Sequence, residues 1–378
     1  MLHYFDNCAT TKMDESAAEI MLKYQTEKYF NPSARSSYSL QVANDIQLAR
    51  EKVQKLLGAT GYDVYFTSGG TESDNLGIVG SLKSKRGNIV ATMSEHSAVY
   101  NTLMELQNKG YEIRLANVLS DGHIDVEDFL SKVDDQTLLA CCMHVNNETG
   151  AINDVKNIVK AVKSLNSATF CFSDGVQAVG KIAVNLCDLG VDIYTLAGHK
   201  FHAGKGVGAL FVKKGVRLTP IVFGGGQEKG VRSGTENVGG IMALAQSLQT
   251  AVQNVSPNTE KFLQFKQILR NSLCSVPEWQ ELCSDNCSPA IFSVAFADVK
   301  GEVLLHMLEQ FEIIVGTGSA CSSKNKQSRI AKAIGLAKNF TEGVLRISFC
   351  KYNTVDETEM LADKLRLCVL QLRKTMLG

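Results

Sequence analysis

Short apolar runs alternate with longer helical patterns between residues 62 and 212, and this alternation restricts the fold more than any other feature of the chain. The apolar runs are 62–68, 87–93, 137–145, 169–174 and 191–197, and the first three are each followed by a helical pattern. Such alternation is typical of a largely parallel sheet with helices on both faces. We therefore predict an α/β fold with a mostly parallel sheet flanked by helices.

The pattern changes after the helical segment 239–255. A helix is predicted over 259–275, and the segments that follow it suggest a smaller α+β domain. A chain of 378 residues is long enough to form two cores. We expect a large domain over 13–255 and a small α+β domain over 256–378, with the N-terminal segment 1–12 packing near the active site.

Composition excludes several classes of partner. Lys+Arg and Asp+Glu both number 39, so the net charge gives no electrostatic reason to expect a nucleic acid or an anionic membrane. No apolar run approaches the ~20 residues that span a bilayer, and the N-terminus does not have the pattern of a secretory signal. The 11 cysteines are scattered and do not form a compact disulfide framework. We expect a reducing, cytoplasmic location.

Reactive and polar residues follow the predicted strands. In open α/β sheets, ligands bind beyond the carboxyl ends of the strands. The residues found there are Gly70 and Thr71, His96, Asn147, Asp174 with Gln177, and His199 with Lys200. Because these ends meet at one edge of the sheet, the sequence predicts a single binding site along that edge.

The turn "SGGTES" at 68–73 is a candidate phosphate site. Free N–H groups and the helix dipole at the start of a helix attract phosphate, although the same residues also suit an ordinary helix cap. The turn is not a Walker A loop, because no Gly-Lys-Ser/Thr follows. The run 204–210 resembles a dinucleotide fingerprint but leads into a strand, which argues against a nicotinamide-dependent dehydrogenase.

Asp174, His96 and Lys200 together indicate a pyridoxal phosphate pocket. Asp174 ends an apolar strand, where it either pairs with a protonated pyridine nitrogen or caps the next helix. His96 either caps a helix or stacks on a flat ring. Lys200 stands directly at a strand end, where a desolvated lysine forms Schiff bases, whereas Lys205 lies in a glycine-rich turn and faces phosphate or solvent. With a phosphate turn, these groups match this cofactor.

The smaller domain adds two candidates. Cys321 stands among small and polar residues in 315–328, a segment predicted to be a mobile, accessible loop, and it is a candidate nucleophile. Arg346 is a charged residue in an apolar strand, where it either binds a carboxylate in two-point contact or forms a buried ion pair. Cys283 and Cys287 are interpreted as chance spacing, because no second pair accompanies them, and no metal site is predicted.

Ordered motifs identify a family. They include "YFDNCATT" at 4–11, "FTSGGTESDN" at 66–75, "DGVQAVGK" at 174–181, "GGGQEKGVRSGTEN" at 224–237 and "GSACSS" at 318–323. In these motifs the chain resembles, nearly end to end, the cysteine desulfurases of the NifS/IscS type, class V members of the fold-type I pyridoxal phosphate enzymes.

The resemblance implies how the cofactor would be bound. Lys200 would bond to pyridoxal 5'-phosphate and shuttle protons, His96 would stack on the ring as acid or base, and Asp174 would pair with the pyridine nitrogen. Gln177 would contact the phenolate oxygen. The phosphate would be bound by Gly70, Thr71, His199 and, in a homodimer, the partner subunit's Thr235.

The resemblance also implies the reaction. Arg346, helped by Asn7, would hold the carboxylate of L-cysteine, and Asn147 would contact substrate and cofactor. Cys321 would take the sulfur as a persulfide, L-alanine would leave, and the sulfur would pass to an acceptor such as an iron–sulfur scaffold or a tRNA-thiolation enzyme. The alternatives are a selenocysteine lyase or another pyridoxal phosphate β-lyase, and an inactive sulfur-delivery scaffold.

The chain departs from the family at a few positions. Ala197 replaces a phosphate-binding serine, and one charged hydrogen bond is worth about 1.5–3 kcal/mol, so weaker cofactor binding is expected. Ser36 stands where histidine is frequent, and Asn153 stands where glutamine is usual. The residues after Cys321 also differ from the family, so that partner docking near this loop is expected to differ.

Overall fold

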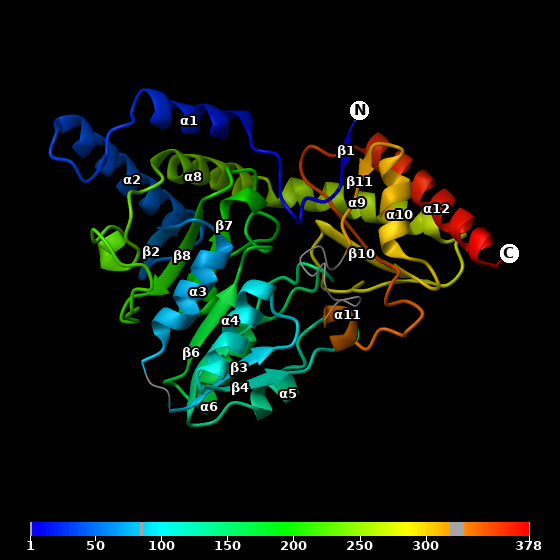
Figure 1. Cartoon of the computed structure of the whole chain (residues 1–378), viewed down its shortest axis with the longest axis horizontal. Coiled ribbons are helices and arrows are strands. Elements are labelled where there is room, and N and C mark those ends of the chain that lie inside the picture. The colour runs from blue at the N-terminus through cyan, green and yellow to red at the C-terminus, as the bar shows by residue number, and fades with distance from the viewer. Residues whose placement is uncertain (1, 84–85, 318–328, 378) are drawn as a thin grey trace.

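A twisted central sheet with helices on both faces forms the larger part of the computed structural model, which describes residues 2–83, 86–317 and 329–377 (Figure 1). Its strand order is β2-β8-β7-β6-β5-β3-β4, and all pairs are parallel except those of β8, which is antiparallel to both neighbours. The strands are β2 (Tyr62–Thr67), β3 (Asn88–Thr92), β4 (Glu112–Ala116), β5 (Thr137–Cys141), β6 (Phe170–Asp174), β7 (Ile193–Ala197) and β8 (Gly208–Lys213). The predicted fold class is confirmed.

Both faces of the sheet are buried because its strands carry apolar residues in succession. Val90 and Phe211 pack on one face with residues of α2, α6 and α8, whereas Ala91 and Leu210 pack on the other with α3 and α4. The helices around the sheet are α1 (Glu15–Thr26), α2 (Ser37–Leu56), α3 (Gly70–Ser81), α4 (Ser97–Asn108), α5 (Val126–Ser131), α6 (Val155–Leu165), α7 (Leu186–Leu189), η1 (Gly198–Lys200), η2 (Glu228–Gly230) and α8 (Val238–Gln253).

A second core lies beside the first. Its antiparallel sheet has the order β12-β10-β9, from β9 (Trp279–Glu281), β10 (Ile291–Phe296) and β12 (Val344–Ser348). The short strands β1 (His3–Tyr4) and β11 (Ile313–Ile314) pair in parallel next to it. The helices of this part are α9 (Val255–Leu273), α10 (Gly301–Glu309), α11 (Arg329–Ala333) and α12 (Val355–Leu377).

The N-terminal segment connects the two cores. Phe5 is fully buried in the second core, whereas the Thr11 N–H donates to the His199 carbonyl of the first at 2.9 Å. This path carries Asp6, Asn7 and Cys8 across the junction. Among the described residues, none of the helices combines the length and apolar character that crossing a membrane requires.

Candidate active site

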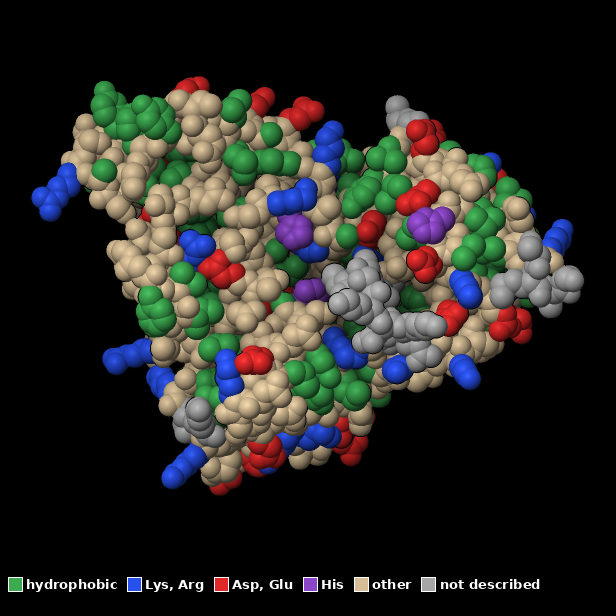
Figure 2. All heavy atoms as spheres, in the orientation of Figure 1, with side chains coloured by type: hydrophobic (Ala, Val, Ile, Leu, Met, Phe, Trp, Pro, Cys, Tyr) green, Lys and Arg blue, Asp and Glu red, His purple; other side chains and the backbone are tan. Residues whose placement is uncertain are grey.

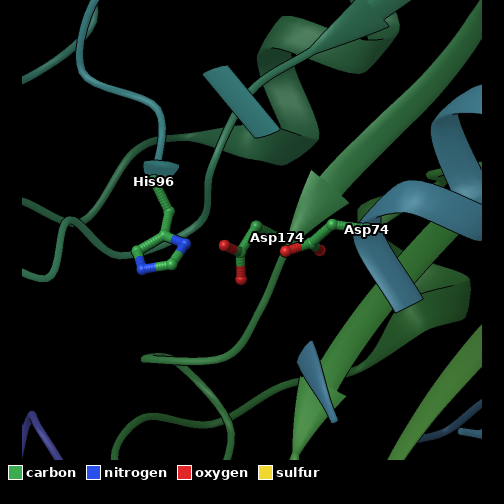
Figure 3. Close-up of side chains that lie close together, drawn as sticks. All are labelled: Asp74, His96 and Asp174. Atoms are coloured by element: carbon green, nitrogen blue, oxygen red, sulfur yellow. The ribbon is translucent and has the colours of Figure 1, made fainter. Parts of the chain in front are cut away.

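Three predicted residues meet at the carboxyl edge of the large sheet. His96 is the N-cap of α4, Asp174 ends β6, and Lys200 ends η1 directly after β7. Figure 3 shows the His96 ring pointing toward the Asp174 carboxylate, with Asp74 of α3 on the other side. One ligand atom each of Asp74, His96 and Asp174 lies within 4.8 Å of the others.

Asp174 and Asp74 are two buried carboxyl groups in close proximity. The Val176 N–H donates to Asp174 Oδ1 at 2.8 Å, and Thr195 Oγ1 donates to Asp74 Oδ1 at 2.8 Å. Burial raises the pKa of both groups, and the charge of Asp174 raises the pKa of Asp74 further, whereas His96 and Lys200 oppose the rise at Asp174. The shared site therefore keeps its proton on Asp74 and its negative charge on Asp174.

His96 is held as a neutral imidazole. Its Nδ1 accepts the Ala98 N–H at 3.1 Å, which leaves the ring hydrogen of the neutral form on Nε2. Burial lowers the pKa of His96, and the neighbouring Asp174 opposes the shift. The imidazole therefore presents its Nε2–H as a donor, because its Nδ1 lone pair is already engaged.

Lys200 lies in a desolvated, positively charged neighbourhood. Its Nζ donates to the carbonyls of Cys8 at 2.6 Å and Ala9 at 2.8 Å. Burial, together with the charges of Lys181 and Arg346, lowers the pKa of Lys200 to about 8. Lysine becomes nucleophilic in such surroundings.

Lys181 was not among the predicted site residues. It is buried and donates to Gln177 Oε1, while Gln177 Nε2 donates to the Cys8 carbonyl at 3.0 Å. Lys181, Gln177 and Lys200 thus meet around one carbonyl of the N-terminal segment. Lys181 ends the motif 174–181, and this position in the sequence was the feature that could have identified it as a site residue.

The turn before α3 has the form of an anion site. Gly69 adopts φ 156° and ψ −175°, a conformation open essentially only to glycine, and an added Cβ would meet no atom within 4 Å. The N–H groups of Gly70 and Thr71 precede the first helical bond of α3, from Ser73 N to Gly69 O at 3.1 Å. A phosphate would find both donors and room here.

The remaining predicted phosphate ligands differ in their surroundings. His199 Nδ1 lies 3.2 Å from Thr10 Oγ1, and burial lowers the pKa of His199 to about 4. Ala197 is buried at the end of β7, and the Thr195 hydroxyl is bound to Asp74. Thr195 therefore does not replace the serine that Ala197 lacks.

Arg346 forms a clamp that is only partly satisfied by the protein. Its Nη2 lies 2.7 Å from Asp6 Oδ1 and its Nη1 donates to the Asn147 carbonyl at 2.9 Å. Arg346 Nε and Asn147 Oδ1 are buried and have no hydrogen-bond partner among the described residues. Buried polar atoms without partners are costly, and a bound carboxylate and amino group would satisfy them.

The backbone around Arg346 fixes this clamp. Gly316 and Arg346 exchange two hydrogen bonds, of 2.9 and 2.7 Å. A Cβ at Gly316 would lie 2.5 Å from Asp6 Oδ1, so glycine is required by the close approach of the ion pair. Asn7 is buried, and its Nδ2 donates to the Ser348 carbonyl at 2.8 Å, which ties the N-terminal segment to β12.

Two predicted residues are not brought into this cluster. Cys321 lies outside the described residues. Thr235 is exposed and, within the described ranges, its side chain has no hydrogen-bond partner. Its segment is held to α2 by the ion pair of Arg50 with Glu228, at 2.7 Å, and to α3 by that of Arg232 with Glu72, also at 2.7 Å.

The donor set fits pyridoxal phosphate. The buried negative charge of Asp174 suits a protonated ring nitrogen, the turn before α3 suits the phosphate, and Lys200 has the lowered pKa that bonding to an aldehyde requires. The structure adds Asp6, Asp74 and Lys181 to the residues expected at this site. All three stand inside the motifs that identify the family.

Comparisons with known proteins agree with this assignment. The family described as Aminotransferase class-V matches residues 3–361. A cysteine desulfurase of Nostoc sp. is 35% identical over 375 residues, which cover 98% of this chain and 93% of the relative. A cysteine desulfurase IscS of Clostridium botulinum is 34% identical over 379 residues, which cover 98% of this chain and 95% of the relative.

Solved structures have the same fold. A NifS-like protein superposes with a TM-score of 0.93 at 34% identity, over 98% of this chain and 100% of the other. A structure described as SspA in complex with cysteine gives a TM-score of 0.81 at 27% identity, over 93% of this chain and 100% of the other. The chain belongs to the class-V aminotransferase family and, within it, to the pyridoxal phosphate-dependent cysteine desulfurases.

Proposed function

We propose that the chain removes sulfur from L-cysteine, holds it as a persulfide on Cys321 and releases L-alanine. The observation that carries this proposal is the meeting of His96 and Asp174 at one sheet edge, close enough to Lys200 for its charge to act on both, with Arg346 near enough to lower the pKa of Lys200. A site for bonding an amine at Lys200, with Arg346 close by to bind a carboxylate, suits an α-amino acid, because that substrate carries both groups on one carbon.

The cofactor would be held by residues of several strand ends. Lys200 would hold it covalently, Asp174 would pair with its ring nitrogen, His96 would lie against the ring, and Gln177 would contact the phenolate oxygen. The phosphate would be bound by Gly70, Thr71, His199 and the partner subunit's Thr235. When bound, pyridoxal phosphate withdraws electrons from the amino acid attached to it.

The protein's own groups then position the substrate and move protons. Arg346, with Asn147 and Asn7, would hold the carboxylate and fix the orientation of the amino acid. Lys200 Nζ would accept a proton, since its lowered pKa allows it to be neutral near physiological pH, and the neutral His96 would donate one from Nε2. The Cys321 thiolate would attack the substrate sulfur, so that an S–S bond forms as the carbon–sulfur bond breaks.

We also propose a homodimer with shared sites. Large apolar side chains are exposed at one end of the molecule, over α1, α2 and the segment after β8, as Figure 2 shows. They are Leu22, Tyr29, Tyr38, Leu40, Leu48 and Phe223. A contiguous apolar surface favours protein association, and the exposed Thr235 is available to a partner's phosphate site.

The same proposal includes the limits of the two domains, the cellular location of the protein and the acceptor of the sulfur. The limits are 13–255 and 256–378, supported by the break between α8 and α9 at Asn254, with residues 1–12 crossing between the two cores. A reducing cytoplasm is supported by the cysteines of the described ranges, which are all unpaired. The acceptor would be an iron–sulfur scaffold or a tRNA-thiolation enzyme.

The test compares wild type with Cys321→Ser in the presence of a reductant and L-cysteine. We expect L-alanine from the wild type and at most about 1% of it from the variant, as for loss of a catalytic nucleophile, with the cofactor absorbance unchanged in both. Equal alanine from both proteins would indicate a β-lyase of the selenocysteine lyase type. No alanine from wild type with bound cofactor would contradict the proposal.

A further inference from the structure

Outside the active site, two cysteines and a buried lysine form a cluster in the loop between β9 and β10. Cys283 is 3% exposed and its Sγ donates to the Asp285 carbonyl at 3.4 Å, whereas Cys287 is partly exposed and its Sγ lies 3.6 Å from the Ser284 carbonyl. Lys266 of α9 is 1% exposed, and its Nζ lies 3.0 Å from Cys287 Sγ. The two cysteines interpreted from the sequence as chance spacing therefore lie on one turn, beside a buried cation.

The surroundings of this cluster shift the pKa values of the two thiols in opposite directions. Lys266 has Cys287 as its hydrogen-bond partner in the part of the chain that the structure describes, and a buried ammonium group needs an anion. The neighbouring Cys283 thiol and the charge of Lys266 lower the pKa of Cys287 to about 6, against burial and Glu281, whereas the pKa of Cys283 is raised. Glu281 is itself paired with Arg270 at 2.8 Å.

We propose that Cys283 and Cys287 are a redox-active dithiol, with Cys287 as the attacking thiolate and Cys283 as the resolving thiol. A peroxide is the oxidant. The Cys287 sulfur attacks the O–O bond, which breaks as an S–O bond forms and hydroxide leaves. The Cys283 sulfur then displaces this oxygen as water and forms the disulfide, so the two sulfurs lose the two electrons that the peroxide gains.

The loop that carries this pair is bonded to the substrate clamp. Cys287 forms a β-bridge with Ala151, Ser288 N donates to Gly150 O at 2.7 Å, and Ile152 N donates to Asn286 O at 3.0 Å. The same turn carries Asn147, whose carbonyl accepts from Arg346. A disulfide, in which the two Cβ atoms lie about 3.8 Å apart, would constrain the turn 283–287, and we expect this constraint to weaken the clamp through the bonds of 286–288. This second step rests on the proposed function of Arg346.

The dithiol is tested in the cofactor-loaded Cys321→Ser protein, which lacks the other candidate nucleophile. Limiting hydrogen peroxide at pH 7 is followed by alkylation and peptide mapping, with the exposed Cys187 and Cys274 as internal references. We expect the peptide with Cys283 and Cys287 to lose two hydrogens and resist alkylation before either reference reacts. Free thiols at both positions after Cys274 has been oxidised would overturn the proposal.

Matched variants test the role of the lysine. Without peroxide, Lys266→Met should slow alkylation of Cys287 at least about fivefold, because its thiolate loses a cation, while Lys266→Arg should retain the rate within about twofold. Cys283→Ala removes the neighbouring thiol without altering α9, and should also slow alkylation of Cys287. Unchanged rates in the variants that fold would overturn the assignment.

The coupling is tested by binding of L-alanine, which has the substrate's carboxylate but no thiol. Half-saturation is read from the cofactor absorbance of peroxide-treated wild type and Cys283→Ser. We expect at least about a threefold weaker binding in the treated wild type alone, and equal values would overturn the coupling. Absence of L-alanine binding in untreated protein would instead contradict the proposed clamp, and would leave the disulfide measurement unaffected.

Discussion

The ionisation of Lys200 depends on a second lysine that does not itself face the reaction. Burial is the first cause of the lowered pKa of Lys200, and the charge of Lys181 is the second. Because the folded-state pKa is about 8, the neutral amine becomes the main form as the pH rises through this value. The rate at which the cofactor-free protein takes up pyridoxal phosphate should therefore rise with a midpoint near pH 8.

Replacing Lys181 should move that midpoint. In Lys181→Met the removal of a neighbouring positive charge raises the pKa of Lys200, so uptake at pH 7.5 should fall about threefold, equivalent to about 0.5 pKa unit. Stopped-flow absorbance against pH measures the midpoint. Lys205→Met is the matched control, because Lys205 acts on the pKa of His199 rather than on that of Lys200. A midpoint unchanged in Lys181→Met would contradict the argument.

For single residues, the sequence predicts which side chains stand at the ends of strands better than it predicts which side chains they contact. Asp174 and Lys200 stand directly after apolar runs, so their placement at the sheet edge follows from periodicity. Asp74 meets Asp174 only because α3 packs over the sheet, and Asp6 meets Arg346 across 340 residues of chain. Arg346 forms the buried ion pair of one interpretation, and its Nε, which has no hydrogen-bond partner among the described residues, is available for the carboxylate of the other.

Among the elements, the segment 222–237 is held by ion pairs of which that between Arg50 and Glu228 is the most buried. Arg50 binds Glu228 through two hydrogen bonds of 2.7 and 2.8 Å, and Glu228 also accepts the Phe66 N–H at 2.9 Å. Glu228 adopts φ 48°, which is strained for a residue with a side chain. The ion pair therefore holds this segment against its local preference.

Removing the charge of Glu228 should destabilise the whole protein. Glu228→Gln leaves Arg50 without its buried counter-charge, so the free energy of unfolding should fall by about 3 kcal/mol, measured by urea denaturation. Lys229→Gln is the neighbouring control, because its pair with Asp63 is exposed and surface pairs contribute about 0.5 kcal/mol. Equal losses in the two variants would show that burial of the Glu228 pair contributes nothing.

The strands were predicted more completely than the first two helices. The apolar run 137–145 extends beyond β5, but Cys142 and His144 still donate to β6, so the longer prediction follows the backbone hydrogen bonds. Helix α2 buries Val42 and Ile46 yet exposes Leu40 and Leu48. Apolar residues on two faces do not give the one-sided pattern by which a surface helix is recognised.

For the whole molecule, the proposed sharing of sites between two subunits makes a prediction about mixed dimers. Loss of a hydrogen bond to phosphate in Thr235→Val should weaken cofactor binding about 10- to 100-fold, and Lys200→Ala should be inactive. A dimer with one subunit of each kind has one complete site if Thr235 acts across the interface. Such dimers, purified through two tags, should regain about half of wild-type activity at limiting cofactor.

Dimers of each variant alone are the controls for the mixed dimer. Dimers of either variant alone should remain near their own low activity under the same conditions. If Thr235 acts within its own subunit, the mixed dimer contains no complete site, and its activity will be no higher than the mean of the two parents.

The two hydrogen bonds between Gly316 and Arg346 also limit where sulfur can be delivered. Cys321 follows Gly316 by five residues, and five fully extended residues span at most about 18 Å. While those bonds hold, the persulfide stays within that radius of the strand that binds the substrate carboxylate. An acceptor with a flat surface would have to bring its thiol inside this radius by close contact with the mouth of the site. A protruding loop or tail would reach the same place with a far smaller interface. The short chain between Gly316 and Cys321 therefore favours acceptors that carry their thiol on such a protrusion.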